Sequence, residues 1–206
     1  MTIEQLIASL IAYLKLHHGS FYTSTKLRDN PNVCHACCIW FLNNVQRNGL
    51  MSTIALLDTL DKSTFQVAQS HALKGPSMPS LMLKQAIGSS HATNRRDLEA
   101  IEHMLDYHAQ PNAYIGDITT FTANLIVACR AGGQDRVIIY MLGSGDTGHV
   151  ICLCRNVGGI VIYDPNMGVM TARFSDADTW GEIIRRILRW YAEHMGLNRF
   201  GFKPQR

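Results

Sequence analysis

Residues 148–168 read GHVICLCRNVGGIVIYDPNMG, two apolar runs that flank a glycine-containing turn. Short runs rich in valine and isoleucine, bounded by Gly, Asn and Pro, are typical of β-strands joined by a hairpin. Similar runs lie before and after this segment, so we expect an antiparallel sheet in the C-terminal part of the chain. Its strands are expected at residues 137–141, 149–154, 160–163 and 167–174, with an edge strand at 199–203.

Helices are expected around these strands. The segment Ser175-Asp176-Ala177-Asp178 is typical of an N-terminal cap and predicts a last helix that runs to about Met195. Residues 19–32 are loop-like. The other expected helices lie within residues 1–18, from Cys34 toward Arg47, at 52–73, at 80–87, at 94–108, and from Asp117 or Thr119 through Ala128. The predicted fold class is therefore α+β, with a helical first half packed on a C-terminal antiparallel sheet.

The composition is that of a globular protein. The chain has 206 residues, 47% of them hydrophobic and 17% charged, which excludes general disorder and is enough for one core. The net charge of +3 comes without a basic stripe, so the sequence does not indicate nucleic-acid binding. Because no linker or repeat divides the chain, residues 1–206 are expected to form one domain, in which residues 1–24 are an N-terminal amphipathic helix and loop.

The first eighteen residues have the apolar spacing of a helix that packs on this domain. The apolar positions are Ile3, Leu6, Ile7, Leu10, Ile11 and Leu14. They are not preceded by a charged region or followed by a small-residue cleavage site, so we do not interpret them as a secretory signal peptide. No apolar run in the chain is long enough to cross a bilayer, and we expect no stable membrane insertion.

The cysteine pattern predicts free thiols. Three of the cysteines fall within five residues and two alternate on a predicted strand, whereas a disulfide framework spaces its cysteines across loops. No second Cys-x-x-Cys or His-x-x-x-His pattern completes a zinc site, so we expect no metal and no other cofactor. The six cysteines are Cys34, Cys37, Cys38, Cys129, Cys152 and Cys154.

Cys34 is the candidate nucleophile. It follows the loop at residues 29–33, which reads DNPNV, and opens an apolar helix. A helix N-terminus carries roughly half a positive charge, which favours the thiolate form of a cysteine placed there. Cys37 and Cys38 lie one turn further along the same helix, and we interpret them as packing residues.

His149 and Asp164 are the candidate partners of this thiol. His149 is expected at the start of one strand, and Asp164 at the end of the next, just before Pro165. Side chains alternate across a strand, so an even number of loop residues between the two strands would place His149 and Asp164 on the same face, and an odd number on opposite faces.

These three residue types are those that thiol-dependent acyl transfer requires. Cys34 would attack a carbonyl, His149 would take and return the proton, and Asp164 would orient the imidazole and stabilise its charged form. The oxyanion would be bound by the backbone N–H of Cys34 and by one side-chain donor, for which Asn30 and Asn32 are candidates.

Three segments around these residues resemble the bacterial effector cysteine proteases of the YopT/AvrPphB type. Residues 34–42, CHACCIWFL, are similar to the nucleophile helix of that family, in which a tryptophan follows the cysteine by six residues. Residues 148–150, GHV, resemble its histidine strand, and residues 163–169, YDPNMGV, resemble its aromatic-Asp-Pro-Asn-x-Gly segment. The separations of 115 and 15 residues are also similar. The resemblance spans about residues 25–205, with Val33 where a glycine is usual.

The resemblance implies a papain-like fold and a cysteine endopeptidase. It also implies a virulence effector that is secreted from a bacterium and acts in the cytoplasm of a host cell. Its partner would be a specific host protein that it cleaves, and a secretion chaperone is a further candidate partner.

Three other functions fit parts of the pattern. Transglutaminase-like deamidases and some cell-wall amidases also use Cys, His and Asp in this order, and the released product would distinguish them from a protease. Residues 34–37, CHAC, are a Cys-x-x-Cys motif at a helix start, as in thioredoxin-like redox proteins, although a loop and not a strand precedes it. A binding module that keeps the fold without catalysis is the third alternative.

Overall fold

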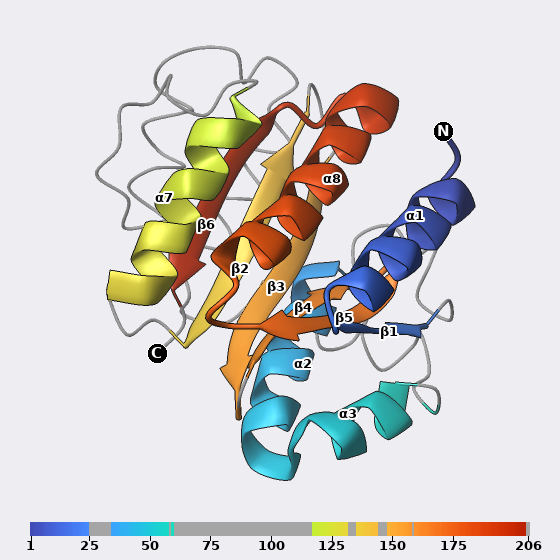
Figure 1. The fold of residues 1–206 in the computed structure, drawn as a ribbon, viewed down its shortest axis with the longest axis vertical. Coiled ribbons are helices and arrows are strands. Elements are labelled where there is room, and N and C mark those ends of the chain that lie inside the picture. Colours follow the sequence, from blue (N-terminus) through green and yellow to red (C-terminus); the bar gives the residue numbers. More distant parts are fainter. Residues whose placement is uncertain are drawn as a thin grey trace.

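The structure is a computed structural model that describes residues 1–24, 34–57, 59, 117–131, 135–143, 148–157 and 159–204. Its centre is a six-stranded antiparallel sheet of order β1-β5-β4-β3-β2-β6 (Figure 1). The strands are β1 (Ser20–Thr23), β2 (Arg136–Leu142), β3 (Gly148–Asn156), β4 (Gly159–Asp164), β5 (Gly168–Arg173) and β6 (Arg199–Pro204). The helices described are α1 (Ile3–Leu16), α2 (Cys34–Asn48), α3 (Leu50–Leu57), α7 (Ile118–Ala131) and α8 (Ala177–Met195).

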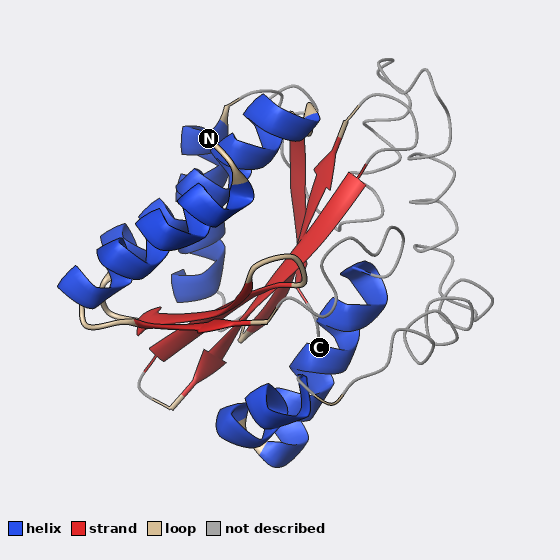
Figure 2. Cartoon of the chain, turned by 90° about the vertical axis from the view of Figure 1, so that its right-hand side faces the viewer, coloured by secondary structure: helices blue, strands red, loops and turns tan. Residues whose placement is uncertain are grey.

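Helices cover both faces of the sheet, which Figure 2 shows between two groups of helices. Helices α1, α7 and α8 form one core with the first face, and α2 and α3 form a second core with the opposite face. Alternate residues of β2 divide between these cores: Val137, Ile139 and Met141 lie in the first, and Ile138, Tyr140 and Leu142 in the second. Because both faces are buried, the strands are apolar almost throughout and do not alternate with polar residues.

In the hairpin between β3 and β4, Asn156 pairs with Gly159, so two residues of the sequence connect the strands. The same register pairs Cys152 with Tyr163, which places residue 151 opposite Asp164. Since residues 149 and 151 are two apart on β3, His149 and Asp164 lie on the same face of the sheet. The loop has the even length that a shared face requires.

Most of the predicted elements that fall on described residues are confirmed. The four strands of the hairpin region and the returning edge strand are present, and β6 pairs with β2. The last helix begins at the predicted cap, where the Asp176 side chain accepts a hydrogen bond from Thr179 N at 3.0 Å. Helix α3 confirms the first part of the helix predicted at 52–73, and residues 58 and 60–73 lie outside the described residues. The helices predicted at 80–87 and 94–108 also lie outside the described residues.

One expectation was wrong at the N-terminal segment. Residues 19–32 are loop-like by composition, yet Ser20–Thr23 form strand β1 at the edge of the sheet, so the sheet is not built from the C-terminal part alone. The segment SFYT contains the aromatic and β-branched residues that suit strands, but it is too short for its pattern to stand out. The pairing depends on Gly168, whose φ of +122° and closeness to β1 exclude a side chain: a Cβ there would lie 2.2 Å from Tyr22 O.

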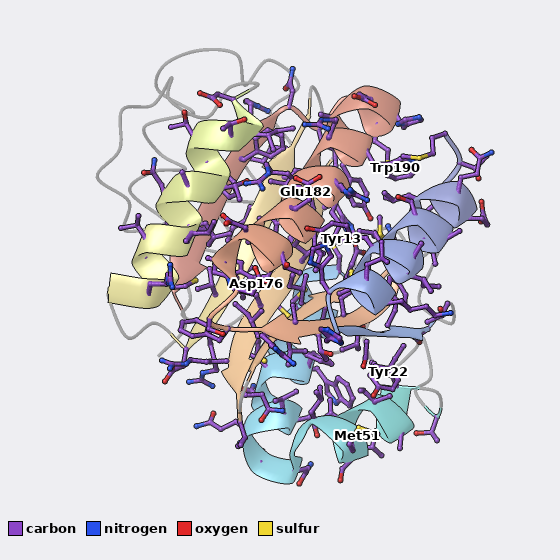
Figure 3. All side chains as sticks on the ribbon, in the orientation of Figure 1. Tyr13, Tyr22, Met51, Asp176, Glu182 and Trp190 are labelled. Atoms are coloured by element: carbon purple, nitrogen blue, oxygen red, sulfur yellow. The ribbon has the colours of Figure 1, made fainter. Side chains whose placement is uncertain are left out.

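Helix α1 packs against α8, as its apolar spacing predicts. Its buried residues are Leu6, Ile7, Leu10 and Leu14. The two helices also share polar contacts: the Arg186 guanidinium lies over the Tyr13 ring at 4.3 Å, and Trp190 Nε1 donates to Met1 O at 2.9 Å. Figure 3 shows Tyr13 and Trp190 in the space between these helices. Among the described residues, no helix has both the length and the apolar character that crossing a membrane requires.

Candidate active site

Cys34 is the first residue of α2, as predicted, and α2 lies along β3. The Cys38 thiol donates to Val150 O at 3.4 Å, and the Cys152 thiol donates to Cys38 O at 3.7 Å. Cys34 precedes Cys38 by one helical turn and lies near His149, the second residue of β3. The helix therefore brings the thiol to the end of the strand that carries the histidine.

The other thiols near Cys34 are buried. Cys37 and Cys38 have no exposed surface, and burial raises the pKa of both thiols well above 9.0. Both therefore remain protonated at neutral pH, and a protonated thiol is a poor nucleophile. Cys34, in contrast, is only half-buried. All six cysteines are free thiols.

His149 joins the thiol to the carboxylate. Its side chain is almost fully buried, and its Nε2 lies 2.9 Å from Asp164 Oδ1. The Cys34 side chain also lies close enough to His149 to raise the pKa of the imidazole. Because Nε2 faces Asp164, Nδ1 is the ring nitrogen left for the thiol. The imidazole thus has both Asp164 and Cys34 as neighbours, with Nε2 toward Asp164.

Asp164 ends β4 and is completely buried. Its carboxylate accepts from the backbone N–H of Asn166 at 2.8 Å and from the Tyr191 hydroxyl at 3.2 Å, in addition to the contact with His149. The turn is closed by Met167 N, which donates to Asp164 O at 3.1 Å. A buried carboxylate is tolerated only when donors and a countercharge surround it. The turn and Tyr191 supply the donors, and His149 supplies the countercharge.

The electrostatics of the site favour a charged imidazole. Burial lowers the pKa of His149, whereas the charge of Asp164, the hydrogen bond with Asp164 and the neighbouring Cys34 raise it. The result is a pKa of about 10 instead of 6.5. At neutral pH His149 is therefore an imidazolium, paired with a buried carboxylate on one side and facing a thiol on the other.

Tyr191 of α8 completes this arrangement. Its ring stacks on His149 with centroids 4.5 Å apart and planes 26° from parallel, and its hydroxyl accepts from Asn166 Nδ2 at 3.0 Å. Nothing in the sequence pattern separates Tyr191 from the other apolar residues of its helix face. Asn166, in contrast, belongs to the Asp-Pro-Asn segment that already indicated a site.

The remaining predicted site residues, Asn30 and Asn32, lie outside the described residues, so the side-chain donor to the oxyanion stays a prediction. Within the part of the chain that the structure describes, no three His, Cys, Asp or Glu residues are grouped to hold a metal ion.

Comparison with known proteins gives one structural likeness. No protein-family model matches the sequence, and no curated protein matches it. Among solved structures, the chain is similar to the crystal structure of the Pseudomonas avirulence protein AvrPphB, with a TM-score of 0.52 and 12% sequence identity. The likeness covers 88% of this chain and 95% of that one. At this identity the similarity shows a shared α+β fold.

Proposed function

We propose that this chain is a cysteine endopeptidase in which Cys34 is the nucleophile, His149 the general acid and base, and Asp164 the group that orients the imidazole. The observation that carries the proposal is the 2.9 Å contact between His149 Nε2 and Asp164 Oδ1, beside Cys34, whose side chain helps to raise the pKa of His149. The three residues come from α2, β3 and β4, so only the fold brings them together.

The raised pKa of His149 suits this chemistry. The His149 imidazolium holds a proton that it can give to a leaving group, and the thiolate is the reactive form of cysteine. The thiolate sulfur attacks the peptide carbonyl carbon, and the carbon–nitrogen bond then breaks as His149 gives its proton to the leaving amine. Water attacks the resulting thioester while His149 accepts a proton from it. The carbon–sulfur bond breaks, the acid product leaves, and the thiolate and imidazolium are restored.

The similarity in fold to AvrPphB is a second, separate support for the proposal. The sequence motifs resemble the YopT/AvrPphB-type proteases, and AvrPphB shares the fold of this chain. We therefore propose that the catalytic domain is papain-like and that the protein is a virulence effector, secreted from a bacterium and acting in the host cytoplasm. Its partners would be a host protein substrate and, before secretion, a chaperone.

The test is to identify the product. Wild-type protein and Cys34→Ala are incubated with a host-cell extract, new protein N-termini are identified by mass spectrometry, and released ammonia is assayed in parallel. New N-termini that depend on Cys34 are the expected result. Ammonia release without new N-termini would replace the protease by a deamidase or transglutaminase with the same three residues. Neither product with wild-type protein would contradict the proposed peptidase activity.

A further inference from the structure

We propose that Tyr191 is a positioning residue of the active site, which holds the Asp164 carboxylate and the His149 ring in the orientation that turns the imidazole toward Cys34. The proposal rests on the proposed function, because it assigns Tyr191 to the same reaction. It extends the site to α8, a helix that carries none of the three residues proposed to act in catalysis.

The first contact fixes the carboxylate. Asp164 Oδ1 accepts from Asn166 N at 2.8 Å and lies 2.9 Å from His149 Nε2, while the Tyr191 hydroxyl lies 3.2 Å from Oδ2 and 3.3 Å from Oδ1. A carboxylate held through one oxygen still rotates about its Cβ–Cγ bond. The hydroxyl on Oδ2 adds a second point of attachment, which keeps Oδ1 directed at the histidine.

The second contact fixes the imidazole. The Tyr191 ring stacks on His149 at 4.5 Å between centroids, so the imidazole lies against a flat wall. Rotation of the imidazole out of this plane would break both the stacking and the Nε2 contact with Asp164. Among the described residues, the titratable groups that face His149 are Cys34 from α2, Asp164 from β4 and Tyr191 from α8.

The direction of the hydrogen bonds agrees with this role. The Asn166 amide NH₂ can only donate, so its bond to the Tyr191 oxygen leaves the phenolic hydrogen free for Asp164. Burial and the nearby Asp164 carboxylate hold the pKa of Tyr191 well above 10.0, so the hydroxyl stays protonated and remains a donor at neutral pH.

Tyr191 is itself held firmly. It has no exposed surface, Trp190 packs edge-on against it at 5.1 Å, and its carbonyl accepts from Leu197 N at 3.2 Å. Trp190 in turn donates to Met1 O, so the end of α8 that carries Tyr191 is tied to the start of α1 (Figure 3). Because Tyr191 is fixed in this way, its contacts restrict the orientations of the Asp164 carboxylate and the His149 ring.

The test removes the hydroxyl and keeps the ring. Tyr191→Phe is compared with Tyr163→Phe, a matched control: Tyr163 is equally buried and precedes Asp164 directly, but it belongs to the opposite core, stacks on Phe41, and its hydroxyl has no hydrogen-bond partner among the described residues. Two quantities are measured on the whole chain. They are the rate of alkylation of Cys34 by iodoacetamide near neutral pH, mapped by mass spectrometry, and the midpoint of the His149 ring titration, followed by NMR.

We expect Tyr191→Phe to slow alkylation of Cys34 by about tenfold, which corresponds to the loss of one hydrogen bond to a charged group. We also expect the midpoint of His149 to move to lower pH, because a carboxylate that rotates spends less time against the imidazolium. Tyr163→Phe should leave both quantities at the wild-type values. If Tyr191→Phe keeps the wild-type rate, or if the midpoint stays or rises, Tyr191 only packs against the site and the proposal is wrong.

A third variant separates this failure from failure of the proposed function. If Cys34 reacts no faster in the wild type than in His149→Ala, then the pairing of Cys34 with His149 is wrong, and the role of Tyr191 is wrong with it. If those two proteins differ and Tyr191→Phe matches the wild type, only the positioning role is lost.

Discussion

Asp164→Asn removes the charge that opposes the burial of His149 and leaves the size of the side chain unchanged. In the wild type, burial alone would lower the pKa of His149, and the Asp164 carboxylate is the largest of the influences that raise it. An asparagine cannot supply this charge, so the histidine of the variant should be neutral at neutral pH. We expect the variant to lose both Cys34 reactivity and a pH-dependent part of its stability.

The size of that stability term follows from the pKa of His149. The folded chain binds the His149 proton with a pKa of about 10, and the unfolded chain with 6.5. A raised pKa stabilises the folded state fully below pH 6.5, and the contribution disappears as the pH rises through 10. The difference corresponds to at most about 5 kcal/mol.

The assay is urea unfolding of wild type and Asp164→Asn at several values between about pH 6 and pH 10. Groups that titrate in the same way in both proteins contribute nothing to the difference between their free energies of unfolding. We expect this difference to be largest near pH 6 and to shrink steadily toward pH 10. Asp178→Asn, at an exposed aspartate in the first turn of α8, should differ from wild type by a small amount that does not change over this range. A constant difference for Asp164→Asn would show that the carboxylate does not hold His149 in its charged form.

Two further changes test the nucleophile and the edge of the sheet. Cys37→Ala should leave the labelling of Cys34 and the release of new N-termini unchanged, since a buried, protonated thiol takes no part in the proposed reaction; loss of activity would favour the redox alternative. Gly168→Ala should lower the free energy of unfolding by at least about 1–3 kcal/mol, measured in urea, because φ is +122° and a Cβ would meet Tyr22 O. An unchanged urea midpoint would mean that β1 does not pair with β5 as described.

The hairpin could be predicted because its information is local. The apolar runs and the turn at residues 157 and 158 set the register, and the register places His149 and Asp164 on one face. The sequence left open only whether the loop length was even. The last helix could be predicted equally well, because Asp176 and Gly196 are capping residues at the ends of a helix with an apolar face.

Other features depend on contacts between residues that are distant in the sequence, which a local sequence pattern does not predict. Strand β1 has only four residues and forms by pairing with β5, where Gly168 lets the two backbones approach closely. Tyr191 is 27 residues from Asp164 in sequence and looks like any other apolar residue of α8. Its role follows from the way in which α8 crosses the sheet, which is a property of the packed fold.

The most direct test of the central claim is mass-mapped labelling with an epoxide inhibitor of papain-like proteases, applied to wild type, His149→Ala and His18→Asn. His18 is an exposed histidine with a φ of 57°, a conformation that asparagine tolerates, so this variant controls for loss of a histidine elsewhere. We expect a single adduct on Cys34 in the wild type and in His18→Asn, and none in His149→Ala. Labelling of Cys34 that persists without His149, or that spreads to Cys37 and Cys38, would contradict it.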